Sequence, residues 1–186
     1  MPLDKKYLIE LLQPGDIILY QGDDSMCSRV IQKYQLWKFD VEHAQYTHVS
    51  VSGRGGVIVD VAPPRVKIDN IFEKYVGRYV KVLRYREYQG DMKQGEVAFW
   101  SASNCNKNYD VWGIAAFKFP ILYKLPIIKN RIEYLNFCSD NGLWSIRQVF
   151  PDAMSSLDPN RCMPAHFSAA IGEEFILKAE GEVPSE

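Results

Sequence analysis

Alternation of apolar and polar residues predicts several β-strands in the first half of the chain. Residues 48–52 (HVSVS) and 57–62 (VIVDVA) alternate with the period of two that is typical of a half-buried strand. The RGG between them predicts a glycine-assisted hairpin turn. Residues 79–87 (YVKVLRYRE) show the same alternation, and the apolar run at 16–20 (DIILY) indicates a buried strand. Together these segments predict an antiparallel sheet.

Helical spacing of apolar residues predicts helices before and after these strands. Residues 137–150 place Leu143, Ile146 and Val149 at helical spacing, and Pro151 ends the pattern. Further helices are predicted at 4–12, 25–38, 68–76, 91–105 and 163–175, the one at 68–76 capped by Asp69. The pattern as a whole predicts an α+β fold, an antiparallel sheet packed with helices, in which residues 1–186 form a single domain.

Composition and charge narrow the class of protein. The chain of 186 residues has a net charge of -1 and no block of like charges, which argues against a nucleic-acid binder because phosphate contacts need a basic face. The stretch FKFPILYKLPII is interrupted by two lysines and two prolines, so it falls short of the roughly 18 apolar residues of a transmembrane helix. No signal-peptide pattern opens the sequence, and we expect reduced thiols in a cytoplasmic protein.

Three residues are candidates for a catalytic site. His48 stands at the start of the strand at 48–52, where it is either a hydrogen-bonded strand-end residue or a catalytic base. Cys138 stands where the helix at 137–150 begins, and there the unpaired backbone amides and the positive helix end favour a thiolate nucleophile. The plainer alternative for Cys138 is a core residue. Asp60 lies on one face of the strand at 57–62 and either faces solvent or orients His48.

The order of these features resembles a known family. A strand in LQPGDIILYQG is followed by YTHVSVSG, VIVDVAPPRV, NYDVWG, FCSDNGLW and MPAHFSAAI. This sequence is similar to the circularly permuted papain-like cysteine hydrolases of the NlpC type, especially the YiiX-like branch, over residues 12–172. The resemblance implies a permuted papain-like fold and a catalytic Cys138–His48–Asp60 triad. In that family a glutamate usually stands where this chain has Asp60, and Ser-Glu usually follows the cysteine, whereas Ser139-Asp140 follows it here.

The resemblance implies an amidase or peptidase that forms a thioacyl-enzyme on Cys138. His48 would accept the thiol proton and then protonate the leaving group, and Asp60 would hold His48. The oxyanion would meet the Cys138 amide and a second donor, for which Tyr20 is the candidate. The substrate would be a peptide, amide or acyl-bearing molecule, and neither a metal nor an organic cofactor is required. Cys162 and His166 have a spacing that suits a metal pair, but no second pair in the sequence completes a site.

Two rival functions stay open at this point. One is a lipid-directed thioesterase or acyltransferase, since the lecithin:retinol acyltransferase branch has a similar histidine-led strand. The other is a non-catalytic binding module on the same fold. Residues 118–135 combine apolar residues with lysines and two prolines, and they predict either a wall or lid over the active groove or a loop packed permanently on the core.

Overall fold

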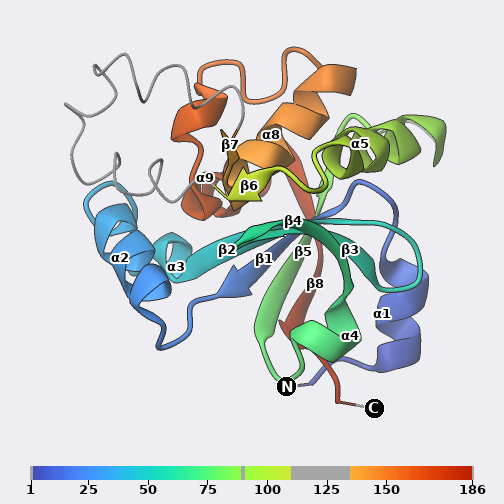
Figure 1. The fold of residues 1–186 in the computed structure, drawn as a ribbon, viewed down its shortest axis with the longest axis horizontal. Coiled ribbons are helices and arrows are strands. Elements are labelled where there is room, and N and C mark those ends of the chain that lie inside the picture. Colours follow the sequence, from blue (N-terminus) through green and yellow to red (C-terminus); the bar gives the residue numbers. More distant parts are fainter. Residues whose placement is uncertain (1, 89–90, 110–134, 186) are drawn as a thin grey trace.

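One sheet organises the fold in the computed structural model, which describes residues 2–88, 91–109 and 135–185. Within these residues the sheet has eight strands in the order β7-β6-β4-β3-β2-β1-β5-β8 (Figure 1). The strands are β1 (Ile17–Gln21), β2 (Tyr46–Ser52), β3 (Val57–Ala62), β4 (Arg65–Asn70), β5 (Tyr79–Tyr85), β6 (Asn108–Tyr109), β7 (Leu135–Asn136) and β8 (Phe175–Glu182). Neighbouring strands are antiparallel except β6 and β7, which are parallel. The α+β class with an antiparallel sheet is therefore confirmed.

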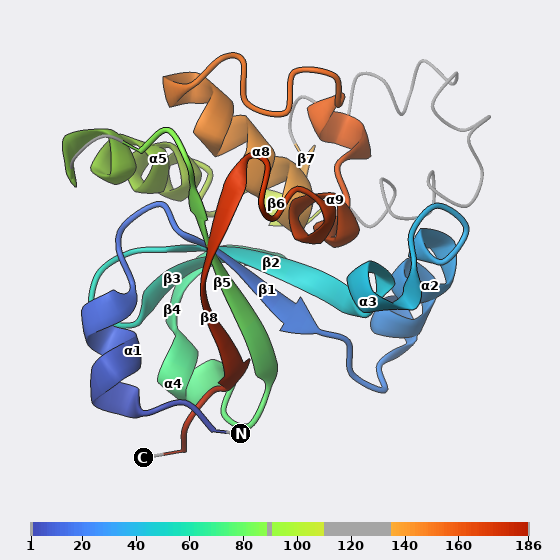
Figure 2. The same cartoon turned by 180° about the vertical axis from the view of Figure 1, so that it is seen from behind.

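Helices cover both faces of the sheet. Those in the described residues are α1 (Lys5–Leu11), α2 (Met26–Gln35), α3 (Val41–Ala44), α4 (Ile71–Lys74), α5 (Asp91–Ser103), α8 (Cys138–Val149) and α9 (Pro164–Ala169), with a 3-10 turn η2 (Pro159–Arg161). Figure 2 shows α5, α8 and α9 on one face and α1 and α4 on the other, while α2 and α3 lie beside the end of β2. No helix in the described part of the chain is long and apolar enough to cross a membrane.

Alternation along β1 divides its side chains between two buried clusters. Ile17 and Leu19 pack in the cluster that contains Leu143 of α8, which we call the α8 core. Ile18 and Tyr20 pack in the cluster that contains Leu8 of α1, which we call the α1 core. This division follows from the period of two in a strand. It means that a residue of β1 belongs either to the α8 face or to the α1 face of the sheet.

The β2–β3 hairpin forms as the RGG turn predicts. Ser50 pairs with Asp60, Val51 with Val59 and Ser52 with Ile58. In the turn Gly56 has a φ of 86°, and a Cβ there would lie 2.4 Å from the Phe72 ring. Only glycine fits this position without strain, because it lacks the Cβ and tolerates positive φ. The turn therefore fixes the register that places Asp60.

Several helices agree with the apolar pattern. Asp4 caps α1 by accepting a hydrogen bond from the Tyr7 amide at 2.7 Å, and α8 begins at Cys138. Ser25 caps α2 through the Ser28 amide, but the apolar side of this segment is not in a core. Met26 is 80% exposed and Trp37, just beyond the helix, is 71% exposed. Trp37 lines the pocket described below, whereas Met26 does not.

Two predicted helices are wrong in part. Residues 68–70 complete β4, which pairs with β3 along its whole length, so α4 starts only at Ile71. Its cap is Asn70, which accepts from the Phe72 amide at 2.9 Å, and not Asp69. The helix predicted at 163–175 ends at Ala169, and Phe175 starts the edge strand β8, which pairs with β5. In the first case pairing with the preceding strand β3, and in the second pairing with the distant strand β5, overrides the local helical pattern.

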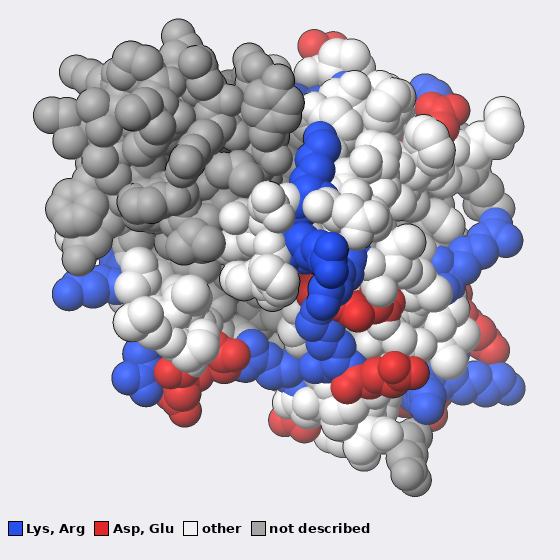
Figure 3. All heavy atoms as spheres, viewed as in Figure 1, with Lys and Arg blue, Asp and Glu red and all other residues white. Residues whose placement is uncertain are grey.

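Two predicted features remain, the segment at 118–135 and the mixed surface charge. The segment at 118–135 lies outside the described residues except for Leu135, so neither the lid nor the packed loop can be compared with the structure. On the face drawn in Figure 3, Lys and Arg side chains stand beside Asp and Glu side chains. This mixture agrees with the net charge of -1.

Candidate active site

An imidazole and a carboxylate are joined on the α1 face of the sheet. Nε2 of His48 lies 2.6 Å from Oδ1 of Asp60. Asp60 pairs with Ser50, which is two residues from His48 on β2, so the two side chains share a face. Asp60 is 0% exposed, and the solvent-facing alternative for it is therefore wrong.

Cys138 reaches the imidazole from the other side of the sheet. It is the first residue of α8, is 4% exposed and belongs to the α8 core. It lies close enough to His48 to help raise the pKa of that imidazole. The β2–β3 ladder ends at Ser50 and Asp60, so His48 lies beyond the paired part of the hairpin and pairs instead with Tyr20 of β1.

Electrostatics favour a charged pair between His48 and Asp60. Burial alone would raise the pKa of Asp60, but the neighbouring His48 and Lys74 lower it to about 2. Burial alone would lower the pKa of His48, but the Asp60 charge and hydrogen bond, together with Cys138, raise it to about 10. The arrangement therefore stabilises an imidazolium beside a carboxylate at neutral pH.

Two further residues hold Asp60, and sequence reasoning missed both. Nζ of Lys74, at the end of α4, contacts Oδ2 of Asp60 and also Oδ2 of Asp69. The Tyr75 hydroxyl donates to Asp60, at 3.0 Å from each carboxylate oxygen. No local pattern pointed to them, because α4 reaches β3 only through the pairing of β4 with β3.

Tyr20, the predicted oxyanion donor, lies in the α1 core. Its side chain is fully buried in the α1 core, and its hydroxyl lies 2.7 Å from Oγ of Ser50. The ring packs on Tyr75, with 4.1 Å between the ring centroids. It is not one of the described residues that line the pocket at Cys138. Tyr20 thus contacts Ser50 and Tyr75, which lie next to Asp60, and its role as an oxyanion donor stays a prediction.

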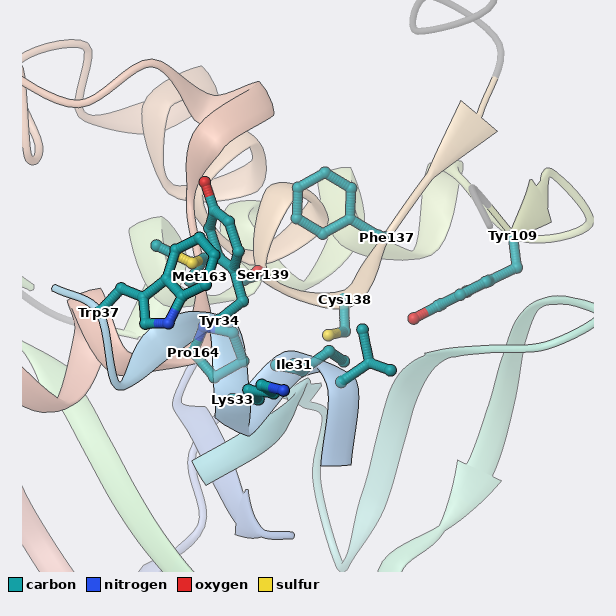
Figure 4. Close-up of a pocket in the computed structure, with 11 residues that line it drawn as sticks. Ile31, Lys33, Tyr34, Trp37, Tyr109, Phe137, Cys138, Ser139, Met163 and Pro164 are labelled. Carbon is teal, nitrogen blue, oxygen red and sulfur yellow. The ribbon is translucent and has the colours of Figure 1, made fainter. Parts of the chain in front are cut away.

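A largely apolar pocket of about 170 Å³ opens beside Cys138 (Figure 4). Its walls come from α2, from the turn after it and from the start of α9, through Val30, Ile31, Tyr34, Trp37, Met163 and Pro164. Lys33 and Tyr109 add polar groups to the wall. In Figure 4 the Tyr109 hydroxyl points toward the side of the pocket where Cys138 lies. Tyr109 belongs to the NYDVWG stretch, one of those that carry the family resemblance.

The remaining cysteines and histidines have other surroundings. Cys27 is exposed, whereas burial raises the pKa of the Cys162 thiol well above its usual value. Nδ1 of His166 accepts the Met163 amide at 2.9 Å, and burial, with Lys38, lowers the His166 pKa to about 4. His43 lies 3.0 Å from Oγ of Ser168. No group of three His, Cys, Asp or Glu side chains among the described residues could hold a metal ion.

The site thus joins a thiol at a helix start, an imidazole and a buried carboxylate, next to an apolar pocket. Such a set can perform nucleophilic acyl transfer, because the imidazole can take the thiol proton while the carboxylate fixes its orientation. No protein-family profile matches this chain, and no curated protein is significantly similar to it.

Proposed function

We propose that this protein is a cysteine hydrolase, an amidase or peptidase that uses Cys138, His48 and Asp60 on a circularly permuted papain-like fold. The observation that carries the proposal is the contact of His48 with the buried Asp60, with Cys138 close enough to raise the pKa of the same imidazole. The order of the histidine strand, the aspartate strand and the cysteine helix supports the permuted arrangement.

The chemistry would proceed in two acyl transfers. The Cys138 sulfur, after its proton moves to His48, attacks the substrate carbonyl carbon and forms a tetrahedral oxyanion. Collapse of this species breaks the carbonyl–leaving-group bond as His48 returns the proton to the leaving amine. Water then attacks the thioester, with His48 taking one proton from it, and the carboxylic acid product leaves as the Cys138 thiol is restored.

Two groups could stabilise the oxyanion. The backbone amide of Cys138 belongs to the first turn of α8, where amides have no acceptor within the helix. The Tyr109 hydroxyl, on the pocket wall, is a better candidate than Tyr20 for the second donor. Loss of one oxyanion donor typically lowers kcat by about 10²–10³-fold. Tyr109→Phe is therefore the informative variant at this position.

The apolar pocket favours a second candidate, a thioesterase or acyltransferase that acts on a lipid-like acyl group. Its walls are mostly apolar and Cys138 is part of them, so an acyl chain could be buried beside the nucleophile. Peptide anilides, acyl esters and acyl thioesters with short and long chains would distinguish the candidates. Turnover of any of them that Cys138→Ala abolishes supports an enzyme. Binding without turnover in the whole panel would point to the non-catalytic module.

A further inference from the structure

Three side chains converge on the Asp60 carboxylate. Oδ1 is contacted by His48 and by the Tyr75 hydroxyl, and Oδ2 by Lys74 and by the same hydroxyl. Because Asp60 is fully buried, these groups take the place of water around it. A carboxylate held at both oxygens cannot rotate away from the imidazole without breaking a contact on its far side.

A positively charged group lies at each oxygen of this carboxylate, and one of the two is shared with another carboxylate. His48 and Lys74 stand on opposite oxygens, and the Lys74 ammonium is shared with Asp69 on β4. The side chain of Lys74 is 34% exposed and that of Asp69 is 30% exposed, so both remain partly hydrated. A second positive charge on the same carboxylate weakens the pull of Asp60 on the His48 proton.

The other ionisable groups facing His48 and Asp60 come from the elements packed around them. They are the Tyr20 hydroxyl of β1, the Tyr75 hydroxyl after α4 and the Cys138 thiol of α8. Burial raises the pKa of both tyrosines, and these phenols stay neutral across the working range of pH. Lys67 pairs with Asp60 in the β3–β4 register, but its side chain is exposed.

We propose that Lys74 is a positioning residue that acts on His48 through Asp60, an inference that rests on the proposed function. Its ammonium fixes Oδ1 toward His48 and limits how firmly Asp60 retains the imidazole proton. His48 must release that proton to the leaving group in every cycle, so an unopposed carboxylate would hold it too well. Asp69 sets the strength of this effect, because it draws the same ammonium away from Asp60.

Removing the positive charge of Lys74 and removing the negative charge of Asp69 should shift the pKa of His48 in opposite directions. Lys74→Met removes a positive charge near the imidazolium and should raise the pKa of His48 by about half a unit or more. Asp69→Asn removes a negative charge and leaves the ammonium to Asp60, so it should lower the pKa of His48. A merely structural role for Lys74 predicts no such pair of opposite shifts.

The experiment is an NMR titration of the His48 ring in the full chain, with circular dichroism as the check on folding. Lys74→Arg should restore the wild-type titration, and Lys67→Met, at the exposed register partner of Asp60, is the matched control. Opposite shifts in Lys74→Met and Asp69→Asn support the proposal. Unchanged or like-signed shifts in the folded variants overturn it, and Asp69→Asn decides alone if Lys74→Met does not fold.

The readout also separates this inference from the proposed function. The titration needs no substrate, so the shifts can be measured whether or not the wild-type protein hydrolyses anything. Absence of turnover by the wild-type chain would count against the hydrolase. If the wild-type protein hydrolyses a substrate but the pKa shifts of His48 are absent, only the positioning role of Lys74 is rejected.

Discussion

His48 and Asp60 meet diagonally across the β2–β3 hairpin. Nε2 lies 2.6 Å from Oδ1 although the register partner of Asp60 is Ser50. The contact depends on both side chains standing on the same face. A slip of one residue in the hairpin would move Asp60 to the other face of the sheet and break the pair. The site is therefore only as well defined as the register of this turn.

The carboxylate should matter far more for turnover than for substrate binding. Asp60→Asn should lower kcat by about 10²–10⁴-fold with little change in KM, because the amide no longer favours the imidazolium or the required tautomer. The alkaline limb of the pH–rate profile should also move to lower pH, since the charge and hydrogen bond of Asp60 no longer offset the effect of burial on the His48 pKa.

Steady-state kinetics on the substrate found in the panel would measure both effects. Asp23→Asn, at a carboxylate that pairs with Arg78 on the surface, is the control and should leave kcat unchanged. Wild-type kcat in a folded Asp60→Asn chain would remove Asp60 from the catalytic set.

The free energy of unfolding should be highest over a middle range of pH and should fall at both more acidic and more alkaline pH. The folded pKa of His48 is raised from 6.5 to about 10, so its stabilisation is complete below pH 6.5 and is lost as pH rises toward 10. The folded pKa of Asp60 is lowered from 3.8 to about 2, so its stabilisation is complete above pH 3.8 and is lost as pH falls toward 2. Urea unfolding across this range measures both flanks. His48→Ala should flatten the alkaline flank, and an identical flank in that variant would refute the assignment.

A charge in the apolar pocket should weaken binding of an apolar acyl group. Ile31→Lys should raise KM for long-chain substrates by about tenfold or more, because a buried ammonium without a partner is costly. Met26→Lys, at an exposed position of the same helix that is not in the pocket wall, is the matched control. Equal KM values for the two variants would show that the substrate binds elsewhere.

The hairpin turn should tolerate alanine at one glycine and not at the next. Gly56→Ala should destabilise the fold by about 2–4 kcal/mol, because its Cβ would overlap the Phe72 ring at a positive φ. Gly55→Ala meets nothing within 4 Å and should cost about 1 kcal/mol from its positive φ alone. Thermal or urea unfolding measures the difference. Equal losses would mean that the Phe72 contact does not constrain the turn.

Much of this fold could be predicted from period alone. The strands at 48–52, 57–62 and 79–87 and the helix that begins at Cys138 carry clear patterns, and each forms. Strand β8 was missed because it is an edge strand, and its identity depends on β5. Val30, Ile31 and Tyr34 of α2 were misleading for a similar reason, since they line a pocket that α9 completes.

The site was predictable to the extent that its residues lie on elements with clear patterns. The order of His48, Asp60 and Cys138 could be taken from the sequence, and the structure brings all three together. Lys74 and Tyr75 could not be found in this way, since they meet Asp60 only through tertiary packing. Alternation alone does not say which face of the sheet carries the pocket, so the placement of Tyr20 in the α1 core could not be predicted from it.

The most direct test of the central claim is the rate at which iodoacetamide alkylates each cysteine at neutral pH. Cys138 is only 4% exposed, whereas Cys27 is exposed and serves as an internal reference. If Cys138 is the thiolate partner of His48, it should react faster than Cys27 despite its burial. His48→Ala should slow Cys138 by about tenfold or more and leave Cys27 unchanged. A Cys138 that reacts more slowly than Cys27 and is indifferent to His48→Ala, in folded protein, would contradict the proposed nucleophile.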